Sequence, residues 1–139
     1  ARAGLADDGV LFLDCFGGTE VPMADLNERT IQDEDGLVND GEPFTYTWEQ
    51  YEYNPLTARM DCVIHFEFED GSRLDEAFRY EWRIWTLPEL RELLLEAGFS
   101  DVRIWSEIED EDGDGTGRYE EVVDLENEGV WWVYISAEN

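Results

Sequence analysis

The stretch from Val10 to Phe16, VLFLDCF, is an almost uninterrupted apolar run, and it constrains the fold more than any other part of the chain. A turn signal, Asp8-Gly9, precedes it, and a pair of glycines follows it. A run of this kind is typical of a strand that is buried on both faces, as in the parallel sheet of an α/β protein. We therefore expect a layered α/β fold with this strand covered on both sides.

The 139 residues carry a formal net charge of −27, with nine arginines and no lysine. Such a negative field repels phosphate backbones and anionic membrane surfaces, which argues against nucleic-acid and membrane partners. Apolar residues still make up 42% of the chain, which excludes a disordered acidic tail. Because the acids are spread along the chain, an adaptation to a screening, salt-rich solvent is favoured, and a site for a cation or metal remains the alternative.

Two cysteines, Cys15 and Cys62, lie in apolar stretches. Two are too few for a disulfide framework, so we expect buried thiols in a cytoplasmic protein. The sequence shows no signal peptide and no apolar run near 18 residues, so we expect no membrane span. The opening ARAGLADDG, without Met, resembles the end of a helix and suggests a piece of a longer protein.

The middle of the chain alternates apolar and polar residues, as strands with one buried face do. Residues that share a face are Phe44, Tyr46 and Trp48 in the first segment; Met60, Cys62, Ile64, Phe66 and Phe68 in the second; and Leu74, Phe78, Tyr80, Trp82 and Ile84 in the third. A two-residue Asp70-Gly71 turn would mix the faces of the last two segments. We therefore predict a hairpin with a three-residue or bulged turn.

The segment TLPELRELLLEAGF predicts the main helix. Thr86 and Glu89 form a capping box, and Gly98 is the expected stop. After it, DVRIWSEIE and VWWVYISA predict strands, and RYEEVVDL a short strand. The polar residues 19–43 predict a loop with at most one helical turn.

Four segments, taken in order, carry a resemblance: GLADDGVLFLDCFGG, an aromatic insertion, FRYEWRIWTLPELRELLLEAGFSDVRIW and WWVYISAE. In this order the chain resembles the C-terminal half of class I S-adenosylmethionine-dependent methyltransferases of the type 11/25-like kind. The resemblance covers nearly all of the chain. It implies a partial Rossmann-like α/β fold in one domain, residues 1–139. The implied order is a fifth strand, a substrate-covering β region at 44–85, a helix, a sixth strand, and a seventh strand antiparallel to the rest.

The resemblance further implies an intact cytoplasmic enzyme that binds S-adenosyl-L-methionine and methylates a small-molecule acceptor. The family's Gly-rich cofactor turn has no counterpart here, because no G-x-G-x-x-G opens a helix after a strand. We therefore expect this chain alone to bind no cofactor and to be inactive. In the family a fourth strand flanks the fifth, so residues 10–16 would have an open edge, and we expect a homodimer or a swapped assembly through it.

Candidate substrate-binding residues lie in the aromatic insertion, where rings could stabilise a cationic methyl donor or an amine, and where arginines could hold an acceptor carboxylate. They are Tyr46, Trp48, Arg79, Tyr80 and Arg83. Simple packing and salt bridges are the competing explanations. On the cofactor side, Asp14 and Phe16 are candidates, because the end of the fifth strand approaches the active cleft in the resembling family. No catalytic residue is identified; His65 is either a general base or a satisfied strand histidine.

The acidic segment DEDGDGTGRYEE fits the calcium-loop pattern D-x-[DN]-x-[DN]-G-x5-E through Asp110, Asp112, Asp114 and Glu121. A calcium-binding helix–loop–helix needs flanking helices, whereas the flanks here alternate like strands. We therefore predict a solvated loop joining two strands and no metal site. A non-catalytic acidic binding domain that binds Ca²⁺ through residues 110–121 is the alternative function.

Overall fold

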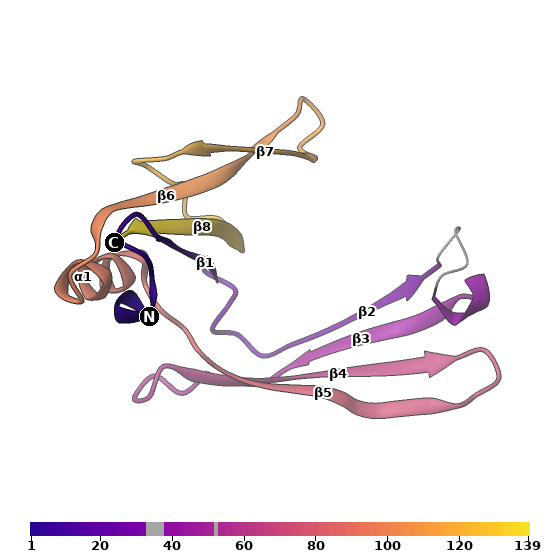
Figure 1. Cartoon of the computed structure of the whole chain (residues 1–139). Helices are drawn as coiled ribbons and strands as arrows, with labels where there is room; N and C mark the ends of the chain where they lie inside the picture. The colour runs from indigo at the N-terminus through magenta and orange to yellow at the C-terminus, as the bar shows by residue number, and fades with distance from the viewer. Residues whose placement is uncertain (33–37, 52) are drawn as a thin grey trace. The chain divides into compact units, whose positions relative to one another are not determined.

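A computed structural model describes residues 1–32, 38–51 and 53–139. The chain divides into two compact units, one made of Ala1–Val21 with Trp85–Asn139 and the other of Pro22–Ile84. The described residues form two four-stranded sheets and one α-helix (Figure 1). The chain thus combines α and β structure, but it is mostly sheet, and neighbouring strands in both sheets pair antiparallel. The insertion was expected at residues 44–85. The second unit ends one residue before the end of that range, at Ile84, and begins well before its start, at Pro22.

The first unit holds a sheet with the strand order β1-β8-β6-β7. Its strands are β1 (Val10–Gly17), β6 (Ser100–Glu109), β7 (Gly115–Glu121) and β8 (Trp131–Glu138), and a short 3₁₀ turn, η1 (Arg2–Gly4), precedes them. Strand β8 pairs antiparallel with both β1 and β6. Consequently β1 and β6 run in the same direction on either side of β8.

Helix α1 (Leu87–Glu96) connects the second unit to β6 and begins and ends as predicted. The Thr86 hydroxyl accepts a hydrogen bond from the Glu89 backbone N–H, and a Glu89 carboxylate oxygen accepts one from the Thr86 N–H at 3.0 Å. Gly98 has φ = +90°, a conformation that favours glycine after a helix. With ten residues, α1 is the longest helix described, and none of the described helices could cross a membrane.

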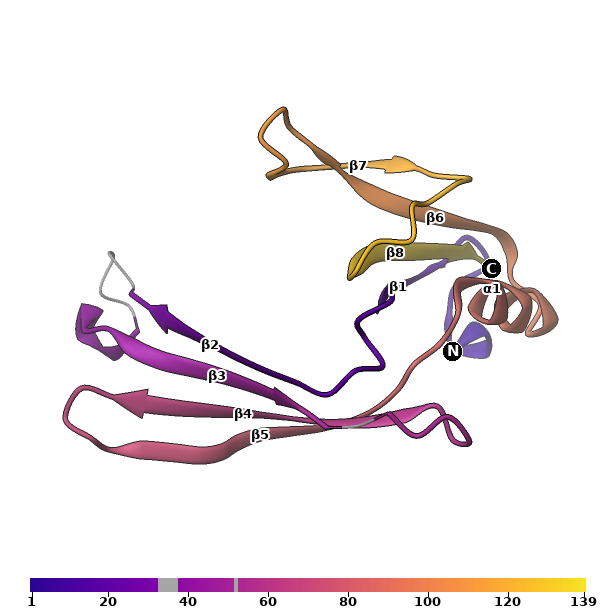
Figure 2. The same cartoon turned by 180° about the vertical axis from the view of Figure 1, so that it is seen from behind.

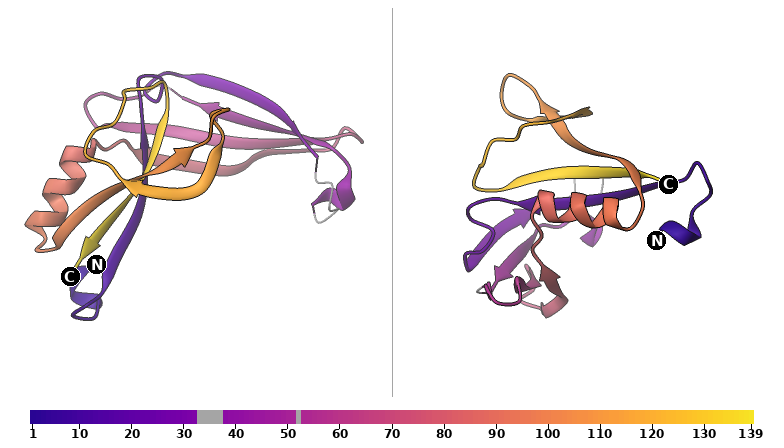
Figure 3. Two further views of the ribbon diagram at one scale, coloured as in Figure 1. Left: turned by 90° about the horizontal axis from the view of Figure 1, so that it is seen from above. Right: turned by 90° about the vertical axis from the view of Figure 1, so that its left-hand side faces the viewer.

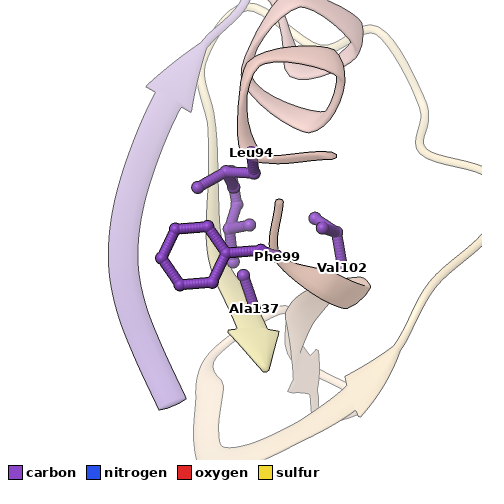
Figure 4. Packing of buried hydrophobic residues seen from close by; sticks show 5 residues of the cluster. Leu94, Phe99, Val102 and Ala137 are labelled. Carbon is purple, nitrogen blue, oxygen red and sulfur yellow. The ribbon is translucent and has the colours of Figure 1, made fainter. Parts of the chain in front are cut away.

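The core of the first unit lies between α1 and one face of its sheet (Figures 3 and 4). Its buried members are Leu94, Phe99, Val102, Ile135 and Ala137, and Leu11, Leu13 and Cys15 of β1 pack against them. Figure 4 shows Leu94 of the helix pointing toward Phe99 and the end of β8. Burial of these side chains holds the helix on the sheet.

The expectation that β1 is buried on both faces is wrong. Leu11 and Leu13 are half-buried toward α1, whereas Val10 and Phe12 on the other face are 52% and 59% exposed. Within this unit the described residues form one α-helix, α1, and it covers only one face of the sheet. Strand β1 also lies at the edge of its sheet, with β8 as its neighbour in the described residues, so its outer edge is open there.

The second unit is a single antiparallel sheet with the order β2-β3-β4-β5 (Figure 2). Its elements are β2 (Asp25–Ile31), η2 (Asn39–Gly41), β3 (Phe44–Gln50), β4 (Arg59–Phe68) and β5 (Arg73–Arg83). The prediction of a loop over residues 19–43 is wrong for β2, where DLNERTI forms a strand by pairing with β3. This segment was missed because its residues show no strong alternation of apolar and polar side chains. The single turn η2 agrees with the prediction, and residues 33–37 lie outside the described residues.

The β4–β5 hairpin has the odd-length turn that was predicted. Phe66 pairs with Leu74 and Ile64 with Phe78, so even-numbered residues face even-numbered residues along the hairpin. A three-residue loop, 69–71, closes it, and the Gly71 N–H donates to the Phe68 carbonyl at 2.9 Å. The register shifts between Ile64 and Phe66, so the hairpin also carries a bulge.

Candidate functional site

One face of the second unit's sheet is lined with aromatic rings. In the strand register Tyr46 lies opposite Phe66, Trp48 opposite Ile64, and Tyr80 opposite Cys62. Directly opposed residues of antiparallel strands point to the same face. Three of the predicted substrate-binding residues, Tyr46, Trp48 and Tyr80, therefore share one face.

Three rings on this face pack against one another in a cluster that we call the ring platform: Trp48, Tyr80 and Trp82. Their ring centres are 5.7 Å apart for Trp48 and Trp82, 5.0 Å for Tyr80 and Trp82, and 6.4 Å for Trp48 and Tyr80. The interplanar angles lie between 28° and 37°. Rings with these separations and angles are roughly parallel, so they pack against one another and stabilise this face of the sheet. Trp82 shares this strand face with Tyr80, as the alternation in the sequence predicted.

An arginine already lies over a ring on the same face. The guanidinium carbon of Arg29, on β2, is 4.7 Å from the centre of the Tyr46 ring, which is within cation–π range. Burial raises the pKa of the Tyr46 phenol, and the positive charge of Arg29 partly opposes that rise. The phenol therefore stays neutral at pH 7. Sequence reasoning missed Arg29 because residues 19–43 were predicted to be a loop.

The other two predicted substrate-binding residues lie on the opposite face. Arg79 and Arg83 pair with Val63 and Arg59, which alternate with the aromatic positions. The two arginines share a face, as predicted from their spacing. Arg79 donates a hydrogen bond to the Asp61 carboxylate at 3.0 Å, and this contact raises the pKa of Arg79. The structure thus separates these arginines from the ring platform.

His65 also lies on this polar face, with both ring nitrogens occupied. Nε2 is 3.3 Å from a carboxylate oxygen of Glu49, and Nδ1 accepts a hydrogen bond from the Glu76 N–H at 3.1 Å. The side chain is 15% exposed. A satisfied strand histidine, the structural alternative, accounts for all of these contacts.

The cofactor-side candidates lie in the first unit, on the face of β1 away from α1. The ring of Phe16 stacks on Trp132, with ring centres 5.6 Å apart and planes 19° apart. Asp14 is exposed and pairs with Tyr134 in the strand register. Because Asp14 and Phe16 are two positions apart on one strand, their side chains lie on the same face.

The acidic segment does not gather its carboxylates around one point. Asp110 accepts hydrogen bonds from the Asp112 and Asp114 N–H groups, both at 3.0 Å, so its side chain closes a turn. Glu121 lies opposite Trp105 at the far end of β7, about 20 Å along the strand from Asp114. Among the described residues, no group of three or more His, Cys, Asp or Glu side chains could hold a metal ion.

Comparison with known proteins gives no match: no family model, no curated protein and no solved structure is similar to the chain. The argument for a function therefore depends on the strand order and on the side chains described above.

Proposed function

We propose that this chain is the C-terminal part of a class I S-adenosylmethionine-dependent methyltransferase. The supporting observation is the order and direction of the elements in the first unit. Strand β1 is followed by a long insertion, then α1, then β6, and finally β8, which runs antiparallel to both β1 and β6. The resembling family has the same succession of fifth strand, insertion, helix, sixth strand and antiparallel seventh strand.

In this proposal the second unit supplies the substrate-side lid. It occupies the place in the chain order where the family carries its substrate-covering region, and it bears the ring platform on one face. A lid of this kind acts by positioning a small-molecule acceptor and by keeping water away from it. The first unit supplies part of the sheet of the Rossmann-like domain.

We propose that the described residues need a further segment to form a cofactor site. Helix α1 begins at Thr86-Leu87-Pro88, without the glycines that let a backbone approach a cofactor closely. Asp14 and Phe16 are the only cofactor-side candidates, and Phe16 is stacked on Trp132. We therefore propose that methyl transfer requires a further segment that carries the Gly-rich turn, and that this chain alone is inactive.

The test is to read the gene upstream of the codon for Ala1 and to express the product of the whole reading frame. We expect a strand, a Gly-rich turn and a helix upstream. We also expect S-adenosylmethionine to bind to the longer product and not to the 139-residue chain, as measured by calorimetry. A matched variant of the longer product with the turn glycines changed to valine serves as the control. A longer product without the turn, or one that does not bind S-adenosylmethionine, would refute the proposal.

A further inference from the structure

We infer that His65 is a pH-dependent switch that closes and opens a bulge in the sheet of the second unit. When its imidazole is neutral, it holds the backbone of β5 at Glu76. When the imidazole is protonated, it releases this backbone and pairs with the carboxylate of Asp75. The inference concerns contacts within this unit and does not depend on the proposed function.

The bulge lies where β5 passes His65. The register of the β4–β5 hairpin leaves three residues of β5, 75–77, opposite the single residue His65 of β4. In the middle of these three, Glu76 has φ = +48°, a left-handed conformation that is uncommon for residues other than glycine. Such a conformation persists only where neighbouring groups hold it in place. The contacts of the Glu76 backbone therefore decide whether the bulge keeps its form.

The side chain of His65 is the group that holds this backbone. Its Nδ1 accepts a hydrogen bond from the Glu76 N–H at 3.1 Å. A ring nitrogen that accepts a hydrogen bond carries no proton, so the proton of the neutral ring lies on Nε2, which is 3.3 Å from a carboxylate oxygen of Glu49. Because Glu49 belongs to β3, the neutral imidazole links the bulge in β5 to the strand on the other side of β4.

Protonation reverses the role of Nδ1. Histidine is the side chain that ordinarily changes its charge between pH 5 and pH 8, and both ring nitrogens of an imidazolium are donors. Nδ1–H would then face the Glu76 N–H, donor against donor, so this hydrogen bond must break. A carboxylate oxygen of Asp75 lies 3.8 Å from Nδ1, close enough to accept the new N–H after a small shift. The contact with Glu49 remains, since Nε2 donates in both states.

The surroundings of His65 attract a positive charge. The ionisable groups that face it, or that contact the groups facing it, come from all three strands: Glu49 and Tyr51 on β3 and just after it, Asp61 and Glu67 on β4, and Arg73, Asp75, Glu76 and Arg79 on β5. The two arginines among them pair with carboxylates within 3.3 Å. Because the ring is only 15% exposed, water screens its charge incompletely, and the ion pair with Asp75 offsets part of the lost hydrogen bond.

The experiment is an NMR titration of the full chain from pH 8 to pH 5 at constant salt, which follows the ring nitrogens of His65 and the backbone amide of Glu76. At pH 8 we expect the Nε2–H tautomer and a hydrogen-bonded Glu76 amide. As the ring takes up its proton, the Glu76 amide proton should move upfield with the same midpoint. Its protection from solvent exchange, corrected for the intrinsic effect of pH, should fall by about two- to tenfold.

His65→Asn is the matched variant for the first half of the switch. Its amide oxygen lies near the position of Nδ1, so it can accept from the Glu76 N–H but cannot titrate. We expect the Glu76 amide of this variant to show no transition between pH 5 and pH 8. The titration of the original chain is informative whether or not this variant folds.

Asp75→Asn tests the second half, because it removes the carboxylate that receives Nδ1–H. At pH 5 we expect the Nδ1 proton to exchange with water faster in this variant than in the original chain. Asp70→Asn is the control: it removes the same charge from the turn of the same hairpin and keeps an acceptor for the Ser72 N–H. It should leave the exchange of the Nδ1 proton unchanged.

The inference is overturned if the ring stays neutral down to pH 5, if the neutral ring is the Nδ1–H tautomer, or if the Glu76 amide does not respond when the ring titrates. It is also overturned if His65→Asn shows the same transition, or if Asp75→Asn and Asp70→Asn have equal effects. None of these results bears on whether the longer product binds S-adenosylmethionine, so the methyltransferase proposal is tested separately.

Discussion

Arg79 and Tyr80 are consecutive residues of β5, and their side chains lie on opposite faces of the sheet. Tyr80 faces the same way as Cys62 and the aromatic rings, whereas Arg79 pairs with Val63 and contacts Asp61. The ring platform and Arg79 therefore lie on opposite sides of the sheet, so the rings and this arginine do not line one surface.

The core of the first unit depends on Leu94. This side chain is 8% exposed and packs against Ile135 and Ala137, whereas its neighbour Leu95 is 45% exposed. We expect Leu94→Ala to lower the free energy of unfolding by about 2–4 kcal/mol, and Leu95→Ala, with the same helix propensity change, by less than about 1 kcal/mol. Urea denaturation measures both. Equal losses would show that α1 does not pack through Leu94.

The thiol of Cys62 makes stability depend on alkaline pH. Burial raises its pKa from 9.0 to about 11. Because the folded state holds the proton more tightly than the unfolded state, this contribution is complete below pH 9 and is lost as the pH rises toward 11. We expect the free energy of unfolding to fall less steeply over this range in Cys62→Ala than in the original chain. Parallel urea-denaturation curves against pH would contradict this.

The acidic segment at 110–121 should show no specific response to calcium. Its first carboxylate closes a turn, and Glu121 lies at the other end of β7. We expect the melting temperature to be the same in CaCl₂ and MgCl₂ at equal ionic strength. A calcium-specific increase that disappears in Glu121→Gln, which removes the bidentate carboxylate, would revive the alternative of a calcium-binding domain.

Excess negative charge should make the fold depend on salt. With a net charge of −27 and carboxylates throughout the chain, self-repulsion destabilises the compact state until ions screen it. We expect the melting temperature to rise with salt, and to a similar extent for NaCl and KCl. A melting temperature that does not change with salt would count against adaptation of the surface to a salt-rich solvent.

The open edge of β1 should pair with a second copy when this chain is alone. In an antiparallel pairing centred on Leu13, Leu11 would lie opposite Cys15 of the second copy and Phe12 opposite Asp14, so like faces would meet. We expect a homodimer or swapped assembly in light scattering, with more of it at high salt. Phe12→Asp should weaken it by repulsion from Asp14, whereas Leu56→Asp, at a 92% exposed position, should not. A monomer at all salt concentrations would contradict this.

Local patterns predicted the elements whose signals lie within a few residues. The capping box at Thr86 and Glu89 located the start of α1, and the parity of apolar positions located the turn of the β4–β5 hairpin. Strand β2 was missed because most of its residues are exposed, and a strand that buries little has little apolar pattern. Its Arg29, and therefore the contact with Tyr46, was missed with it.

The apolar run in β1 shows a different limit. Its sequence predicts a strand correctly, but burial on each face depends on which elements lie over it, and those are remote in sequence. The separation of Tyr80 from Arg79 could have been predicted, because strand alternation alone requires it. Which of the two faces is lined with rings also follows from the pattern, whereas the tilt and spacing of the rings depend on the packing of three strands.

The position of β8 bears on how the protein is made. Strand β8 lies between β1 and β6 and hydrogen-bonds to both, although more than a hundred residues separate it from β1 in the chain. On the ribosome, the segment from Pro22 to Ile84 is contiguous and can assemble its sheet early, whereas the edge of β1 that pairs with β8 must wait for residues 131–138 to emerge. During that interval this edge of an apolar strand stays open, and slow translation of the last third of the chain would prolong the delay.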